Sequence, residues 1–193
     1  MSLKRYRDKR DFRNTPEPSG KPRPESEQHR FVVHEHHASR LHFDLRLEMG
    51  STLKSWAVPK GPSLNPAEKR LAVEVEDHPI EYLEFKGEIP RGEYGAGRVY
   101  IWDSGTYQPK SPDVLTQWTE GHIEFVMHGH VLKGGFALVE MKRRRSAGKR
   151  SWLLIKIKDR YADPQWRLVL REGSRQRRGS GRKANATAKS AKR

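Results

Sequence analysis

Short alternations of apolar and polar residues fill the middle of the chain. In residues 41–48 the apolar side chains hold odd positions and the polar ones even positions, which is the period of a strand with one buried face. The helical period is weak, and it predicts a single short helix over residues 113–119, while the Gly-rich run 87–97 predicts an irregular loop. The predicted strands span residues 31–35, 41–48, 52–58, 70–76, 98–102, 122–127, 131–141 and 152–158.

This pattern indicates an all-β fold, a barrel or a sandwich. About eight short strands with little helix fit either architecture. No internal repeat is found. The chain has 193 residues, which is the usual size of one domain with tails.

Charge divides the chain into three parts. The net charge is +15, from 39 Lys and Arg against 24 Asp and Glu, but residues 31–170 are nearly balanced and hold most of the large apolar side chains. We therefore predict a barrel domain over 31–170, a basic N-terminal segment over 1–30, and a disordered basic tail or linker over 171–193. The tail could serve as a solubilising linker or as an arm on nucleic acid.

Several classes of protein are excluded at this stage. The chain has no Cys, so disulfides, thiolate metal sites and Cys nucleophiles are ruled out. It has no apolar run long enough to span a membrane, and its first residues lack the apolar stretch of a signal peptide. We expect a monomer that is neither membrane-bound nor secreted by that route.

Candidate chemistry gathers on two neighbouring strands. His42, Asp44 and Arg46 share one face of the strand over 41–48, and His34 and His36 share a face of the strand before it. Residues i and i+2 lie about 6.6 Å apart on a strand, close enough for two side chains to lean onto one metal ion. His36, His42 and Asp44 thus predict a divalent transition-metal site with open positions for substrate or water.

A third strand, over residues 70–76, offers further titratable groups. Its alternation predicts that Leu71, Val73 and Val75 are buried. The opposite face would then present polar groups towards the metal. His78 on this face and Arg46 on the strand over 41–48 are the cations expected around a phosphate. The predicted polar face comprises Arg70, Glu74, Glu76 and His78.

Four motifs in order give the chain a resemblance to a known family. Residues 36–46 read HHASRLHFDLR, residues 53–63 read LKSWAVPKGPS, residues 75–79 read VEDHP and residues 89–97 read IPRGEYGAG. Together they resemble the 3′-phosphoesterase domain of bacterial DNA ligase D, over about residues 10–158. His34 departs from the family, where Gln is expected, and His37 stands where Asp is common.

The resemblance implies an all-β fold, a small closed or nearly closed β-barrel of about eight strands with little helix. It also implies a manganese-dependent enzyme of the bacterial cytoplasm that heals 3′ ends before ligation. Such enzymes remove a terminal 3′ ribonucleoside and then hydrolyse the remaining 3′-phosphate. The implied partners are DNA or DNA/RNA primer-template 3′ ends, with ligase and polymerase modules or end-binding repair proteins. Position by position, the resemblance assigns the metal to His36, His42 and Asp44, phosphate handling and catalysis to Arg46, His78 and Tyr82, the monoesterase step to Lys60 and Arg70, and the ribonucleoside step to Arg10, Asp11, Glu17 and Glu76, with His34 as a further candidate.

Two other functions use the same residues. Two His and one carboxylate on a barrel also describe a non-haem iron oxygenase or a cupin, which would bind an organic acid. A non-catalytic nucleic-acid module would use Trp56 and Trp102 as stacking platforms instead. A metal swap separates the first from a phosphoesterase, and indifference to chelator would identify the second.

Overall fold

The structure, a computed structural model, describes residues 3–21, 24, 28–146 and 148–171. Strands dominate this part of the chain, as the alternating pattern predicts. The described elements are α1 Lys4–Arg7, β1 Arg30–His37, β2 Leu41–Met49, β3 Thr52–Val58, β4 Arg70–Glu74, the 3-10 helix η1 Ile80–Leu83, β5 Gly87–Ile89, β6 Gly97–Pro109, α2 Val114–Glu120, β7 His122–Gly129, β8 Lys133–Ser146 and β9 Lys149–Lys156.

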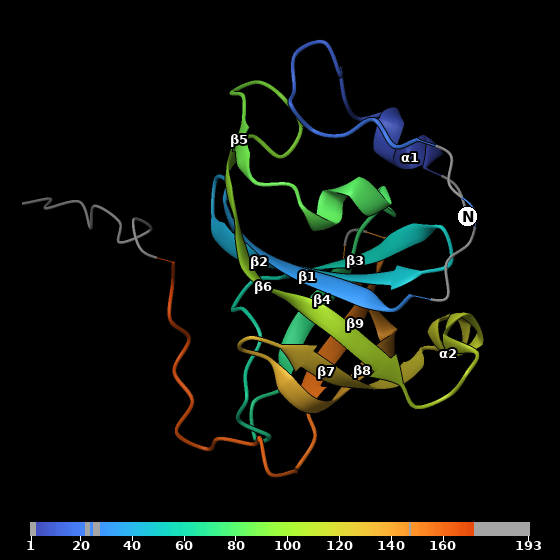
Figure 1. The fold of residues 1–193 in the computed structure, drawn as a ribbon, viewed down its shortest axis with the longest axis vertical. Coiled ribbons are helices and arrows are strands. Elements are labelled where there is room, and N and C mark those ends of the chain that lie inside the picture. Colours follow the sequence, from blue (N-terminus) through green and yellow to red (C-terminus); the bar gives the residue numbers. More distant parts are fainter. Residues whose placement is uncertain (1–2, 22–23, 25–27, 147, 172–193) are drawn as a thin grey trace, which may run out of the picture.

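The strands form a closed antiparallel barrel (Figure 1). Their order is β1-β2-β3-β4-β9-β8-β7-β6, and β6 pairs with β1 to close the ring of eight, while β5 adds to the start of β6. Closure leaves no long unpaired edge among these eight strands. The prediction of a small closed all-β barrel is confirmed.

Alternate side chains fill the barrel. Phe43, Leu45 and Leu47 of β2 point inward, as their odd positions predict, and each is at most 1% exposed. Trp56 of β3 meets Trp152 of β9 edge to face, with ring centroids 5.8 Å apart. This core fixes the register of β1–β3, because a shift of one residue would turn every apolar side chain outward.

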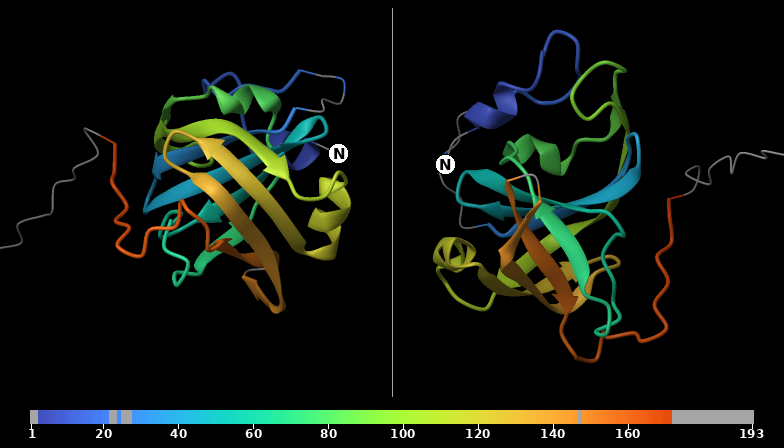
Figure 2. Two further views of the ribbon diagram at one scale, coloured as in Figure 1. Left: turned by 60° about the horizontal axis from the view of Figure 1, so that its bottom comes forward. Right: turned by 180° about the vertical axis from the view of Figure 1, so that it is seen from behind.

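A second apolar cluster lies outside the barrel, over the outer face of β1–β3. Helices α1 and η1 cover that face (Figures 1 and 2), and Tyr6, Ile80, Tyr82 and Leu53 pack there. The polar side chains on the outer face of β1 and β2 are therefore buried rather than solvated. A buried polar face requires partners, which is the first sign of a site here.

Two local predictions are wrong. The run 87–97 is not wholly irregular, because β5 and the first residue of β6 lie in it and pair with each other. In β4 the buried face is inverted: Leu71 is 38% exposed, whereas Ala72 is fully buried beside Trp152. Both faces of β4 are partly covered, so alternation alone could not decide which faced the core.

The last described residues run along the barrel wall. The Trp102 indole donates to the carbonyl of Val169 at 2.8 Å, and the backbone N–H of Arg171 donates to Glu35 at 2.8 Å. Trp56 and Trp102 are both buried, so neither is an exposed stacking platform. The predicted tail lies outside the described residues except for Arg171. Among the helices of the described ranges, none is long and apolar enough to cross a membrane.

Candidate metal and phosphate site

A cavity of about 320 Å³ opens between the outer face of β1–β3 and the segments that cover it. Its walls are mostly titratable, and they come from the N-terminal segment, β1, β2, the turn after β4, η1 and the loop before β6. The lining side chains discussed below are Arg10, His36, His42, Asp44, Arg46, Glu76, His78, Tyr82, Tyr94 and Lys149.

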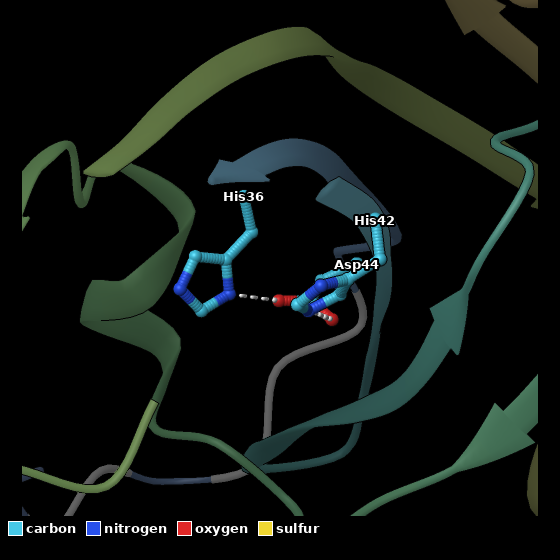
Figure 3. Close-up of side chains that lie close together, drawn as sticks. All are labelled: His36, His42 and Asp44. Atoms are coloured by element: carbon cyan, nitrogen blue, oxygen red, sulfur yellow. Dashed lines mark ion pairs between the residues drawn. The ribbon is translucent and has the colours of Figure 1, made fainter. Parts of the chain in front are cut away.

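His36, His42 and Asp44 converge at this cavity (Figure 3). Their nearest ligand atoms all lie within 4.8 Å of one another. His36 Nδ1 is 3.5 Å from one oxygen of Asp44, and His42 Nε2 is 3.6 Å from the other. The three side chains therefore lie close enough to bind one ion, as the sequence predicts.

The other nitrogen of each imidazole is fixed by the backbone. His36 Nε2 donates to the carbonyl of Gly95 at 2.8 Å, and His42 Nδ1 donates to the carbonyl of Arg40 at 3.0 Å. A carbonyl can only accept, so these nitrogens carry the protons and the lone pairs of His36 Nδ1 and His42 Nε2 face Asp44. This is the arrangement by which proteins orient imidazoles towards a metal.

The backbone explains how these residues meet. His36 lies opposite His42 in the β1–β2 register, and His34 lies opposite Asp44. Gly95 has φ +79°, in the left-handed region that favours glycine, and its turn directs the carbonyl to His36. A Gly-rich loop thus orients a metal ligand, which gives the motif over residues 89–97 a physical role.

Arg46 lies beside Asp44 and is almost fully buried. Its Nη2 donates to Asp44 at 3.1 Å, and its Nε donates to His34 Nδ1 at 3.4 Å. Burial alone would raise the pKa of Asp44, yet that pKa lies below its usual value, and the charge of the adjacent Arg46 is the largest lowering effect. Asp44 is therefore a carboxylate.

The remaining nitrogen of Arg46, Nη1, is buried and has no hydrogen-bond partner within the described residues. An unpaired buried guanidinium nitrogen is costly, and an anion entering the cavity would satisfy it.

His34 serves as an acceptor for Arg46. Its Nε2 donates to the carbonyl of Phe85 at 3.0 Å, which leaves Nδ1 free to accept. Burial, with the Arg46 charge acting in the same direction, lowers the pKa of His34 to about 3, so the ring stays neutral. His34 does not line the cavity itself. His37, the other residue that departs from the family pattern, contacts Glu35 at 2.6 Å.

His78 lines the cavity opposite the two strands. Burial lowers its pKa well below 6.5, and the charges of Arg46 and Arg10 lower it further, against a smaller raising effect of Asp44. Its Nδ1 donates to the backbone carbonyl of Glu76 at 2.9 Å, so the lone pair of Nε2 is directed to Arg10, 3.4 Å away. In the ligand-free protein His78 is therefore neutral.

The N-terminal segment completes the wall with an ion-pair network. Arg10 contacts Glu17 at 2.8 Å and Glu76 at 3.4 Å, and all three side chains are nearly inaccessible to solvent. The Tyr82 hydroxyl donates to Glu17 at 2.6 Å, and Lys9 donates to Glu76 at 2.8 Å. Burial opposes ionisation of Glu76, but Lys9 and Arg10 lower its pKa below the usual value.

Three predicted residues lie elsewhere. Lys60 and Arg70 line a separate cavity of about 430 Å³ that shares no lining residue with the first, and Arg70 is bound there to Glu68. Asp11 is bound to Arg13 at 2.7 Å and does not line the cavity. The roles that the resemblance implies for these three residues stay predictions.

Sequence reasoning did not single out Tyr94, Gly95 and Lys149, which line the cavity, or Lys9, which lies beside it and donates to Glu76. Tyr94 is 44% exposed at the rim, and Lys9 lies 4.6 Å from the centre of its ring. Lys149 comes from β9, far along the chain from the four motifs. Lys9 had a signal, because it adjoins Arg10, but nothing in the pattern around Lys149 connected it to the strands near residue 40.

Comparison with known proteins identifies the family. The model of the DNA ligase D 3′-phosphoesterase domain matches residues 34–140, more than half of the chain. The chain belongs to this family. It is 53% identical over 160 residues to the multifunctional non-homologous end joining protein LigD of Pseudomonas aeruginosa and 47% identical over 163 residues to that of Mycolicibacterium smegmatis. Each match covers 81% of this chain but only 19% and 21% of those proteins, so the chain spans about a fifth of their length.

Membership of this phosphoesterase family supports the predicted hydrolase class over the oxygenase, cupin and non-catalytic readings. The matched segment contains His36, His42 and Asp44, whose side chains converge in the cavity, together with Arg46 and His78. Arg10 and Glu17 precede residue 34, so their part in the site comes from the contacts described above.

Proposed function

We propose that this chain is a metal-dependent DNA 3′-end-healing phosphoesterase. It removes a 3′-terminal ribonucleoside as a phosphodiesterase and converts a 3′-phosphate to a 3′-hydroxyl as a phosphomonoesterase. The observation that carries the proposal is one cavity in which two oriented imidazole lone pairs and a carboxylate lie next to a guanidinium with an unpaired nitrogen. Phosphoryl transfer requires this combination of charge neutralisation and positioning.

The donor set fits a divalent metal. Imidazole and carboxylate ligands suit Mn²⁺ and its neighbours in the first transition series, and we propose Mn²⁺ as the ion. When bound, the metal would neutralise phosphate charge and lower the pKa of a water molecule that attacks phosphorus. Backbone carbonyls of Gly95 and Arg40 hold the two rings in the required tautomers.

The protein's own groups bind and orient the phosphate. Arg46 Nη1 donates to a non-bridging oxygen and remains anchored by Asp44 and His34. An arriving phosphate offsets the positive charges of Arg46 and Arg10 that depress the pKa of His78. His78 Nε2 can then hold a proton and donate it to a phosphate oxygen or to the leaving oxygen.

The ribonucleoside step draws on the N-terminal network. Arg10 and Glu76 bring charges to the cavity wall, and the buried Glu17 holds Arg10 and Tyr82 in place there. Hydroxyl groups of a ribose would find donors and acceptors there. Asp11 lies just outside the wall and supports the turn over residues 11–15.

We propose that primer-template 3′ ends are the substrate and that ligase and polymerase modules, or end-binding repair proteins, use the product. Two of the relatives are by name end-joining proteins, which supports a place before the ligation step. The substrate is chromosomal DNA, so we propose that the enzyme acts in the bacterial cytoplasm. Lys60 and Arg70 are proposed to assist the monoesterase step from their neighbouring cavity.

The test is incubation of the purified chain with a 3′-phosphate primer-template and with a primer ending in one ribonucleotide. We expect a free 3′-hydroxyl with Mn²⁺ and no product in excess chelator. Asp44→Asn should be inactive, and Asp8→Asn, which changes an exposed carboxylate, should be as active as the unchanged protein. Chelator-resistant turnover, or oxygen uptake with ferrous iron in place of hydrolysis, would overturn the proposal.

A further inference from the structure

A second cavity, of about 200 Å³, adjoins the candidate site. The two cavities share Val75, Glu76 and Lys149 as lining residues, so they lie side by side. The second is formed by α1, the end of β4 and the start of β9.

The walls of the second cavity are mainly cationic. Its charged lining residues are Arg5, Lys9, Lys149, Arg150, Glu74 and Glu76. Both carboxylates already have partners: Arg150 lies 3.4 Å from Glu74, and Lys9 lies 2.8 Å from Glu76.

Two cations remain uncompensated. Arg5 and Lys149 are exposed, and within the described part of the chain neither side chain forms a hydrogen bond or an ion pair. They come from opposite ends of the sequence, yet they line the same small cavity. Holding two like charges there without a counter-charge costs electrostatic free energy, and an anion bound between them would recover it.

We infer that this second cavity binds the phosphodiester next to the reacting 3′ terminus, through Arg5 and Lys149. The inference rests on the proposed function, because it takes the terminal phosphate to lie at Arg46. A DNA strand carries one negative charge for each nucleotide. When the terminal phosphate lies at Arg46, the next phosphate of the strand therefore lies close to the rim of the first cavity, next to Lys149.

The chemistry of this subsite is that of a phosphate clamp without base recognition. Arg5 presents a planar guanidinium and Lys149 a compact ammonium group, and both would contact the phosphate and not the edge of a base. Contacts of this kind fix the register of a strand and carry no sequence information. The subsite would therefore set which linkage faces the metal ligands and leave the base sequence free, as an enzyme acting on arbitrary breaks requires.

The experiment compares two doubly substituted full-length chains. R5Q/K149Q removes both cations of the subsite, and K110Q/K133Q removes two exposed lysines that line neither cavity. Affinity for a 3′-phosphate primer-template is measured by fluorescence anisotropy over a series of salt concentrations. The same primer is also made with an uncharged methylphosphonate at the linkage next to the terminus.

If one phosphate is bound, R5Q/K149Q lowers the slope of log affinity against log salt by about 0.7 to 0.9, and the control variant leaves it unchanged. The methylphosphonate lowers the slope by the same amount in the unchanged protein and not further in R5Q/K149Q. Equal slopes in the two variants, or additive losses from variant and methylphosphonate, would overturn the subsite.

Hydrolysis in single turnovers at saturating protein separates this inference from the proposed function. We expect R5Q/K149Q still to hydrolyse the primer in single turnovers with Mn²⁺, because His36, His42, Asp44 and Arg46 are unchanged in it. If the unchanged protein fails to hydrolyse the primer, the proposed function fails whatever the slopes show. If it hydrolyses the primer and the slopes do not differ, only the subsite fails.

Discussion

The Tyr82 hydroxyl donates to Glu17 Oε1 at 2.6 Å, across 65 positions of the sequence. The same oxygen accepts from Arg10 at 2.8 Å, so one buried carboxylate joins η1 to the N-terminal segment. Burial raises the pKa of Tyr82 well above its usual value; Arg46 acts against this and Glu17 adds to it. The phenol therefore stays protonated, and the segment is held to the site by charge as well as by apolar packing.

Glu17→Gln should destabilise the protein. The change leaves the Arg10 guanidinium buried with Glu76 as its remaining carboxylate, at 3.4 Å. Removing one partner of a buried ion pair lowers the free energy of unfolding by about 3–5 kcal/mol. Because Glu76 remains as a partner of Arg10, we expect a loss near the lower limit, about 3 kcal/mol. Urea unfolding without metal measures the loss. Asp8→Asn, at an exposed pair in the same segment, should change stability little, and a comparable loss there would contradict the argument.

His42→Ala and Asp44→Ala should each abolish both activities by removing a metal ligand. Binding of an ion to the folded protein alone adds about 2.7 kcal/mol of stability at a concentration 100 times its dissociation constant. The increase in melting temperature on adding Mn²⁺ should therefore disappear in both variants. His122→Ala, on the exposed end of β7, is the control that should keep the increase. Activity above a few per cent in either ligand variant would refute the assignment.

Strand alternation was sufficient to predict an all-β fold and the shared face of His36, His42 and Asp44, whereas the choice of a barrel came from the family resemblance. In β2 the period is unbroken, so the inward Phe43 and Leu45 and the outward His42 and Asp44 could be assigned without coordinates. The neighbouring β1 is in phase with it, which brings His36 to the same face.

Alternation failed where two layers cover a strand or where the chain leaves the sheet. Leu71 of β4 is exposed while Ala72 is buried, since Ala72 pairs with Trp152 and Leu71 lies in the wall of the separate cavity of Lys60 and Arg70. Lys149 reaches the cavity only through the pairing of β9 with β4 and β8. Such long-range placement depends on the barrel's closure, and no local pattern encodes it.

Arg46→Lys should reduce turnover severely and leave Mn²⁺ binding intact. The three N–H donors of a lysine sit on one nitrogen, so they cannot reproduce the three separate positions from which Nε, Nη2 and Nη1 of Arg46 face His34, Asp44 and the cavity. We expect a fall in kcat/KM of at least about 100-fold, about 2.7 kcal/mol of transition-state stabilisation. Calorimetric titration with Mn²⁺ gives the second readout. Lost metal affinity in this variant would show that Arg46 acts through Asp44 instead of on the phosphate.

Stability without metal should fall as the pH drops below about 6.5. Since burial lowers the pKa of His78, the folded state keeps this ring neutral while the unfolded state takes up a proton. The unfolded state then binds more protons, so acid favours it; one such group costs about 1.4 kcal/mol between pH 7.5 and 5.5. His78→Gln should lose this share of the pH dependence in urea unfolding with chelator present. An unchanged dependence would mean that His78 is protonated in the fold.

Removing residues 1–21 should reduce ribonucleoside removal more than 3′-phosphate hydrolysis. The deleted segment carries Arg10 and Glu17, whereas the metal ligands and Arg46 lie on the barrel strands. It also uncovers the cluster around Ile80 and Tyr82, so folding should be confirmed first by circular dichroism and thermal melting. Removing residues 172–193, which lie outside the described residues, is the matched deletion; it should weaken DNA binding at physiological salt and leave single-turnover rates unchanged. Both rates are measured for both deletions on matched primers. Equal loss of the two activities in the N-terminal deletion would show that Arg10 and Glu17 serve the phosphate itself and not the ribose.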